Sequence, residues 1–277
     1  MVKSIQIDRV ETSAEKIQIV NLLYEGDDQF VPITPLATLN ASTTFLKASI
    51  DGKGDIRAAS SSAEWLLGCD RATMQDDCTV YELASSIVHS PMGGFKPPIP
   101  TLQQIFTFAR LIDILAPYIA PEDGRKHRIS VIAAIAAEND ASLAGMEGIG
   151  MTDVASLPKW LDYEHRGWFP KIGKTRPTNE ARYLWFPGDR VKAFMESVAP
   201  YVGGAKAMQR ESARKKGTVE SFGIDIKLGE YSDLLGRFGG SLDEAVKNIP
   251  YDIFSEPPEL ARLNEDYSGQ PRTEIVF

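Results

Sequence analysis

The chain has 277 residues, 43% of them hydrophobic and 25% charged, with a formal net charge of −8. This composition predicts a folded, water-soluble protein of one large domain or two modest ones. It excludes a membrane-spanning protein, because no run of about 18 apolar residues occurs. The N-terminus lacks the apolar core of a signal peptide, so we expect a cytoplasmic protein with no membrane partner.

The N-terminal part of the chain predicts strands. Within residues 1–58, Ile5 and Ile7 alternate with polar neighbours, and Ile17 and Ile19 do the same after a polar turn. Alternation with a period of two is typical of half-buried strands. We therefore expect a small antiparallel sheet or two hairpins in this part.

Capping boxes then predict helix starts. In this motif a Ser or Thr side chain accepts a bond from the backbone N–H three residues later, where a Glu or Gln side chain returns the bond. The motif occurs at Ser61 with Glu64, Thr79 with Glu82, Thr101 with Gln104, and Ser241 with Glu244. We expect a helix to begin at each of these places.

The second half of the chain predicts mainly helix. Apolar residues fall on one face from Leu102 to Ala116, and the apolar run at 129–137 indicates a buried central helix. The other elements that we expect are a helix at 152–163, a strand at 222–228, and helices at 231–238 and 242–248.

A Pro- and Gly-rich linker at 91–100 divides the chain. Before it, residues 1–90 form a mixed β/α region. After it, residues 101–256 form a mainly helical core, and residues 257–277 form an extended C-terminal arm. The expected fold class is α+β and mostly helical, with a small N-terminal antiparallel β region followed by a helical bundle-like region.

One segment, residues 160–216, concentrates basic and aromatic side chains. Three of the four tryptophans lie in it, and residues 165–216 hold 12 Lys and Arg against 4 Asp and Glu, a local charge of +8 (12 − 4). Cations can replace the counterions of phosphates, and flat rings can stack on bases. A solvated surface would also explain the charge. We favour a site for single-stranded nucleic acid.

The residues expected to contact phosphates are Arg166, Lys171, Lys174, Arg176, Arg182 and Arg190, with Lys206, Arg210 and Arg214 as a second row. The residues expected to stack on bases are Trp168, Phe169 and Tyr183. If residues 205–216 are helical, the second row forms one stripe along that helix.

Residues that carry metal or catalytic chemistry do not form a recognisable pattern. Cys69 and Cys78 lack CxxC spacing, and no histidine lies beside them. The triplet Gly-Lys-Thr at 173–175 ends like a phosphate-binding loop, but Trp168 stands where that loop needs its first glycine. We expect no metal, no cofactor and no catalytic residue, although catalytic groups can converge from distant positions.

These patterns favour a structural nucleic-acid-binding protein of coat or nucleoprotein type, in the cytoplasm or in a virion, and not an enzyme. It would self-assemble and bind single-stranded nucleic acid, RNA in preference to DNA, without reading the sequence. The apolar end within residues 268–277 either folds back on its own domain or links subunits. The alternative is an enzyme or binding module that uses the basic loop 165–190 for a phosphorylated or acidic ligand.

The segment 99–106, Ile-Pro-Thr-Leu-Gln-Gln-Ile-Phe, resembles the start of a helix in one viral family. Coat proteins of flexuous filamentous plant RNA viruses run Pro-Thr-Leu-Arg-Gln-Ile at a comparable place. The resemblance spans these residues only, and no site residue is carried over from it.

Overall fold

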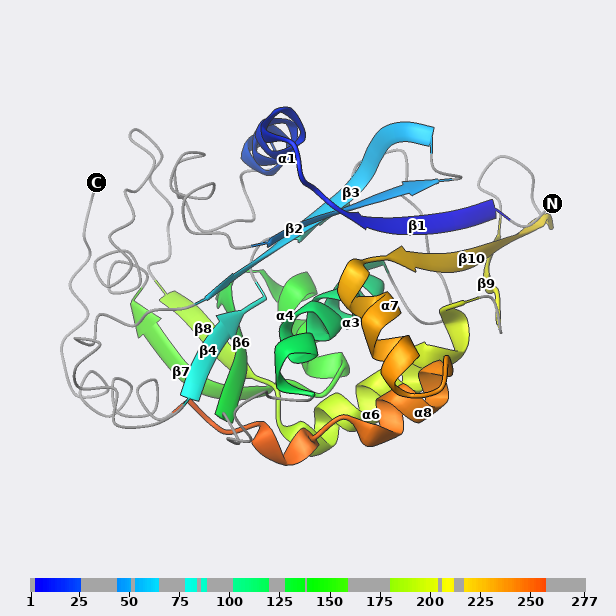
Figure 1. Cartoon of the computed structure of the whole chain (residues 1–277). Coiled ribbons are helices and arrows are strands. Elements are labelled where there is room, and N and C mark those ends of the chain that lie inside the picture. Colours follow the sequence, from blue (N-terminus) through cyan, green and yellow to red (C-terminus); the bar gives the residue numbers. More distant parts are fainter. Residues whose placement is uncertain are drawn as a thin grey trace.

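The computed structural model describes residues 3–25, 44–50, 53–64, 78–83, 86–88, 102–119, 128–137, 139–158, 180–203, 206–211 and 217–257. These residues form one ten-stranded mixed sheet with helices packed on it (Figure 1). None of the described helices is long and apolar enough to cross a membrane.

The strands are β1 (Lys3–Arg9), β2 (Thr44–Ile50), β3 (Lys53–Glu64), β4 (Cys78–Glu82), β5 (Ser86–Val88), β6 (Arg128–Ala136), β7 (Thr152–Pro158), β8 (Glu180–Trp185), β9 (Met208–Glu211) and β10 (Val219–Lys227). The helices are α1 (Ser13–Glu25), α3 (Leu102–Leu115), α4 (Asp140–Gly148), α6 (Gly188–Val198), α7 (Gly229–Arg237) and α8 (Leu242–Asn248). Short 3-10 turns form η4 (Ala116–Tyr118), η5 (Ala199–Tyr201) and η6 (Tyr251–Ile253).

The strands lie in the order β7-β8-β6-β4-β3-β2-β1-β10-β9, and β5 also pairs with β3. Two pairs are parallel, β1 with β10 and β4 with β6, and the other described pairs are antiparallel. Since β1 and β10 come from distant parts of the chain, one sheet unites the N-terminal and C-terminal regions.

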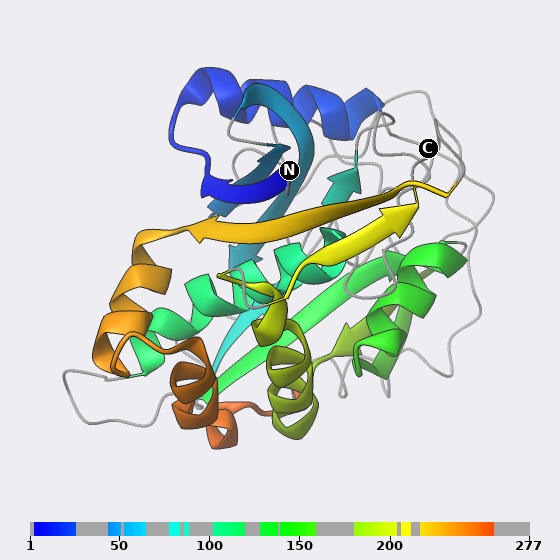
Figure 2. The same ribbon diagram turned by 90° about the vertical axis from the view of Figure 1, so that its right-hand side faces the viewer.

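Helices cover both faces of the sheet. Helix α1 lies on one face, and α3, α6, α7 and α8 lie on the other (Figures 1 and 2). In β2, both Phe45 and Leu46 are buried, although neighbouring side chains of a strand point to opposite faces. Apolar packing therefore exists on both sides of the sheet. Leu46 belongs to the large core, together with Phe106 and Leu111 of α3.

Several predicted elements are confirmed. The helix predicted to begin at Leu102 is α3, and the helices predicted at 231–238 and 242–248 are α7 and α8. The Ser241 side chain caps α8 by accepting a bond from the Glu244 N–H at 3.4 Å. The strand predicted at 222–228 is the second part of β10.

The predicted fold class, mostly helical with a small N-terminal antiparallel β region, is wrong. Residues 128–136 form strand β6 instead of a buried helix, and residues 152–158 form strand β7. A short, continuous apolar run fits a strand covered on both faces as well as it fits a buried helix. Strands therefore continue through the region that we expected to be helical.

The elements expected near the N-terminus also differ. Ile17 and Ile19 lie in helix α1, which the Thr12 side chain caps: the Glu15 N–H donates to the Thr12 hydroxyl at 3.3 Å, and that hydroxyl donates to the Glu15 carboxylate at 2.9 Å. The same motif at Ser61 and at Thr79 lies in strands β3 and β4. Without helical periodicity after it, a Ser or Thr followed three residues later by Glu does not start a helix.

The domain division remains a prediction. The linker at 91–100 and the arm residues 258–277 lie outside the described residues. The ten-stranded sheet combines strands from both sides of that linker.

Candidate functional site

The sheet divides at the carboxyl end of β4. Residues 78–82 of β4 pair with residues 128–132 of β6, and the Leu83 N–H donates to the Ile132 carbonyl at 2.8 Å. Beyond this point, residues 133–136 of β6 pair with β8, whereas β5 pairs with β3. Among the described residues, no ladder joins β5 to β6. We call this place, where the two halves of the sheet lose their common hydrogen bonds, the split.

Helix α3 supports the split. Together with β5 it lies in the connection between the parallel strands β4 and β6, and it packs against β3 and β5. In open sheets with parallel strands, ligands bind outside the carboxyl ends of the strands, at the point where the arrangement of strands changes. The split is such a point, and it is therefore the candidate functional site of this chain.

The backbone of Ala134 faces the split. The Ile132 carbonyl points to β4, where it accepts from Leu83, and the Val131 carbonyl points to β8, where it accepts from Phe186 at 2.9 Å. Successive residues direct their backbone groups to alternate edges of a strand. The N–H and C=O of Ala134 thus point to the same side as those of Ile132. In the described part of the sheet, no strand pairs with Ala134 on that side.

Two charged side chains near the split are buried. Glu82, the last residue of β4, is 5% exposed, and Arg110 of α3 is 0% exposed. Burial lowers the pKa of Arg110 to about 9, and the negative charge of Glu82 opposes that shift. The two charges therefore act on one another. A buried carboxylate at a strand end is a candidate general base.

Tyr81 links β4 to the end of α3. Its hydroxyl lies 2.8 Å from the hydroxyl of Tyr118 in η4. The two rings meet edge to face, with their centroids 6.3 Å apart. Tyr81 directly precedes Glu82, so this contact fixes the position of β4 immediately before the buried carboxylate.

The described residues contain no group of three or more His, Cys, Asp and Glu that could hold a metal ion.

The structure places two residues of the predicted nucleic-acid site in β8. Arg182 donates to Asp153 of β7 at 3.1 Å and to Glu147 of α4 at 2.8 Å, and these bonds, that to Asp153 first, raise the pKa of Arg182. Its charge is thus balanced within the protein. Tyr183 is 1% exposed, so no base can lie on its ring.

The other predicted site residues lie elsewhere or outside the described residues. Arg190 is exposed on α6, Lys206 is exposed, and Arg210 lies in strand β9, so the region that we considered as a helix contains a strand. The residues outside the described part of the chain are Arg166, Trp168, Phe169, Lys171, Lys174, Arg176 and Arg214.

Solved structures that resemble the chain include an acetyltransferase and a protein bound to acetyl-CoA. The IAA acetyltransferase from Bacillus cereus shares 10% identity at a TM-score of 0.41, and the match covers 66% of this chain and 98% of that one. NAA60 from Arabidopsis thaliana, solved in complex with acetyl-CoA, shares 9% identity at a TM-score of 0.43, with 66% and 98% covered. No protein-family model and no curated protein matches the chain.

The expectation of a coat protein or nucleoprotein that is not an enzyme is corrected, because the solved structures that match the chain include an acetyltransferase. Single-stranded nucleic acid is withdrawn as the expected partner, and so is assembly into a virion. The alternative of an enzyme agrees better with the matches. The arm at 268–277 and most of the basic loop 165–190 lie outside the described residues.

Glu82 and Ala134 are the site residues that the sequence analysis missed. Glu82 was interpreted as part of a helix cap, and Ala134 as part of a buried helix. One signal was present: Glu82 lies between Val80, Tyr81 and Leu83, and a carboxylate within an apolar, β-prone run is unusual for a solvated surface.

Proposed function

We propose that this chain is an acyltransferase. It binds an acyl thioester of coenzyme A at the split and transfers the acyl group to an acceptor with a proton to lose, an amine or a hydroxyl. The observation that carries the proposal is the split: the backbone edge at Ala134 and the buried residue Glu82 both lie at the carboxyl ends of two parallel strands.

The edge at Ala134 fits the donor substrate. Coenzyme A bears amide groups along the flexible arm that ends in its thiol, and an extended arm presents N–H and C=O groups as a strand does. When a ligand adds to an open sheet edge, main-chain hydrogen bonds supply the affinity. Ala134 offers one donor and one acceptor on the side that no described strand occupies.

Glu82 fits the role of the general base. An attacking amine or hydroxyl must lose a proton, and a carboxylate within reach can accept it. When bound, the thioester supplies an acyl group that is already activated for attack; as the new bond to the acceptor forms, the C–S bond breaks and coenzyme A leaves as the thiol, which takes up one proton. Arg110 is a charged side chain that acts electrostatically on Glu82. Proton transfer to a positioned group contributes a factor of roughly 10²–10⁴ to the rate.

A pair of proline variants tests the edge. Ala134→Pro removes an N–H that faces the split, whereas Ile135→Pro removes one that lies in the ladder to Arg182 of β8. Proline is tolerated where the strand N–H has no strand partner and disrupts a ladder elsewhere. Circular dichroism melts should therefore show that Ala134→Pro remains folded and that Ile135→Pro is much less stable.

Calorimetric titration with acetyl-CoA then measures binding. The unmodified chain should bind it saturably, and Ala134→Pro should bind about fivefold more weakly, since one net hydrogen bond contributes about 1 kcal/mol and 1.4 kcal/mol is a factor of ten. Thiol release with a panel of amines should fall by roughly 10²-fold or more in Glu82→Gln at unchanged binding. If the chain does not bind acetyl-CoA, or if folded Ala134→Pro binds it equally well, the proposal is wrong.

A further inference from the structure

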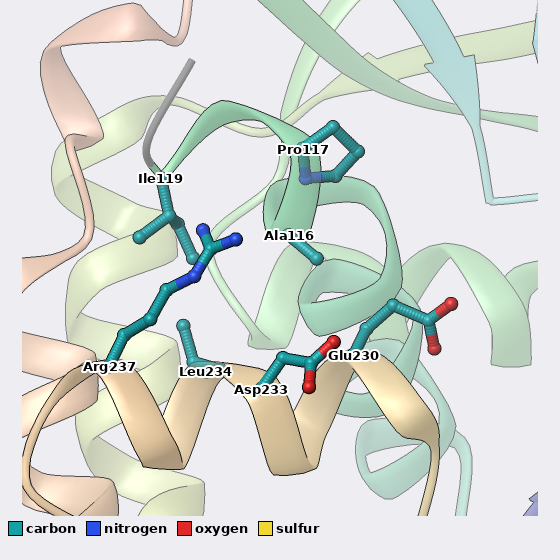
Figure 3. Close-up of a pocket in the computed structure, with 7 residues that line it drawn as sticks. All are labelled: Ala116, Pro117, Ile119, Glu230, Asp233, Leu234 and Arg237. Carbon is teal, nitrogen blue, oxygen red and sulfur yellow. The ribbon is translucent and has the colours of Figure 1, made fainter. Parts of the chain in front are cut away.

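A pocket of about 220 Å³ lies between η4 and helix α7 (Figure 3). One wall comes from the end of the α3 segment and the other from successive turns of α7. The lining residues are Ala116, Pro117, Ile119, Glu230, Asp233, Leu234 and Arg237. The pocket is separate from the split, because neither Glu82 nor Ala134 lines it.

The walls of the pocket combine an apolar surface with charges. Ala116, Pro117 and Ile119 face Leu234, which is 2% exposed. In Figure 3 the side chains of Asp233 and Arg237 rise from α7 on the side of the apolar wall. A ligand in this pocket therefore has an apolar surface to cover and charged groups within reach.

Asp233 and Arg237 are the two charges available to a ligand. Glu230 is already engaged, since it accepts a bond from Arg9 at 2.7 Å. An acidic residue followed four positions later by a basic one has the spacing at which helix side chains pair. Within the described part of the chain, however, Asp233 and Arg237 form no ion pair with one another, and both are exposed. A carboxylate and a guanidinium thus stand one helical turn apart at the pocket, each able to take a partner.

We propose that this pocket binds a free amino acid with an apolar side chain. The ammonium group would pair with Asp233 and the carboxylate with Arg237, while the side chain covers Leu234 and the η4 wall. Arg and Asp side chains make their strongest hydrogen bonds with groups of opposite charge. The volume of the pocket agrees with a ligand as small as an amino acid. Pockets for drug-sized ligands have volumes of about 300–1,000 Å³, and this pocket is smaller.

Three probes separate the contributions of the two charges. L-leucine has both charges, N-acetyl-L-leucine lacks the ammonium group, and L-leucinamide lacks the carboxylate. Each is titrated into the full chain and followed by calorimetry and by NMR chemical shifts. L-leucine should bind saturably, and each of the other two should bind at least about tenfold more weakly, the effect of losing one charge-assisted bond.

Two variants tie this selectivity to the pocket. Asp233→Asn should abolish the preference for L-leucine over N-acetyl-L-leucine, and Arg237→Gln should abolish the preference for L-leucine over L-leucinamide. Lys247→Gln on α8, where the lysine pairs with Glu244 at 3.2 Å on the surface, is the matched control and should change neither preference. All these side chains are exposed, so the variants should fold.

The proposal is wrong if L-leucine does not bind, if all three probes bind equally, or if Asp233→Asn and Arg237→Gln leave the preferences unchanged. It does not depend on acyl transfer, because no readout uses acetyl-CoA. A chain that binds L-leucine but not acetyl-CoA would refute the proposed function and support the amino-acid pocket. A chain that binds acetyl-CoA but not L-leucine would refute the amino-acid pocket and leave the proposed function standing.

Discussion

Removing one of the two buried and oppositely charged side chains, Arg110 and Glu82, should destabilise the protein far more than removing both. Arg110 is 0% exposed and Glu82 is 5% exposed, so neither charge can regain water when its neighbour is lost. Breaking a buried pair costs about 3–5 kcal/mol, whereas replacing both members by apolar residues is often neutral. Arg110→Met and Glu82→Met should each lose this amount, and the double variant should recover most of it.

Urea unfolding followed by circular dichroism measures this double-mutant cycle. Because each single variant should lose about 3–5 kcal/mol and the double variant should lose little, the coupling energy should exceed about 3 kcal/mol, which is the upper end of the usual range. Since small domains are stable by only about 5–15 kcal/mol, each single variant should also melt at a clearly lower temperature. The surface pair of Glu244 and Lys247 is the control, and its coupling should be at most about 0.5 kcal/mol. If the effects of Arg110→Met and Glu82→Met simply add, each charge is satisfied by other groups and the reasoning is refuted.

Further predictions concern packing and pH. A Cβ at Gly188 would overlap the backbone carbonyl of Tyr251, so Gly188→Ala should destabilise the protein by about 1–3 kcal/mol in urea unfolding. A Cβ at Gly236 in α7 would meet no neighbouring group within 4 Å, so Gly236→Ala should stabilise the protein by about 0.4–1 kcal/mol. Equal changes in the free energy of unfolding for Gly188→Ala and Gly236→Ala would contradict this packing. The Lys47 ammonium, and then the Thr12 hydroxyl, lower the pKa of Glu15. A carboxyl with a lowered folded pKa stabilises the protein above its unfolded value, here 4.5, and the contribution is lost as the pH falls through the folded pKa. The free energy of unfolding of Lys47→Met should therefore fall less on acidification below that pH than that of the unmodified chain. If the two free energies fall in parallel with pH, Lys47 does not lower the pKa of Glu15.

The sequence correctly predicted the helices whose capping residues and apolar face lie close together in the chain. Ser241 and Glu244 are three residues apart, and both cap residues and the apolar face of α8 lie within one short stretch of sequence. Helix α3 is similar, because its apolar residues recur with helical spacing from Leu102 onward. In both cases the sequence contained the information that decides the structure.

Strand β6 and the site at the split depend on distant partners. The apolar run at 129–137 becomes a strand because residues 78–82 and 181–185 pair with its two edges, and nothing within the run reveals those partners. The importance of Glu82 likewise arises from burial beside α3, which is a tertiary property. The basic and aromatic composition of 160–216 suggested a site, but composition alone does not separate a binding surface from ion pairs such as that of Arg182 with Asp153.

The parallel pairing of β1 with β10 has a consequence for synthesis on the ribosome. Ile5 lies beside Ile224 in the sheet, although the chain between them includes most of the molecule. At elongation rates of about 5–20 residues per second, β1 emerges roughly 10–40 seconds before its neighbour exists. During that interval one edge of β1 offers unpaired backbone groups to any other nascent chain. Slowing translation downstream of β1 should therefore favour aggregation of this protein, and a chaperone that covers an exposed strand edge should counteract it.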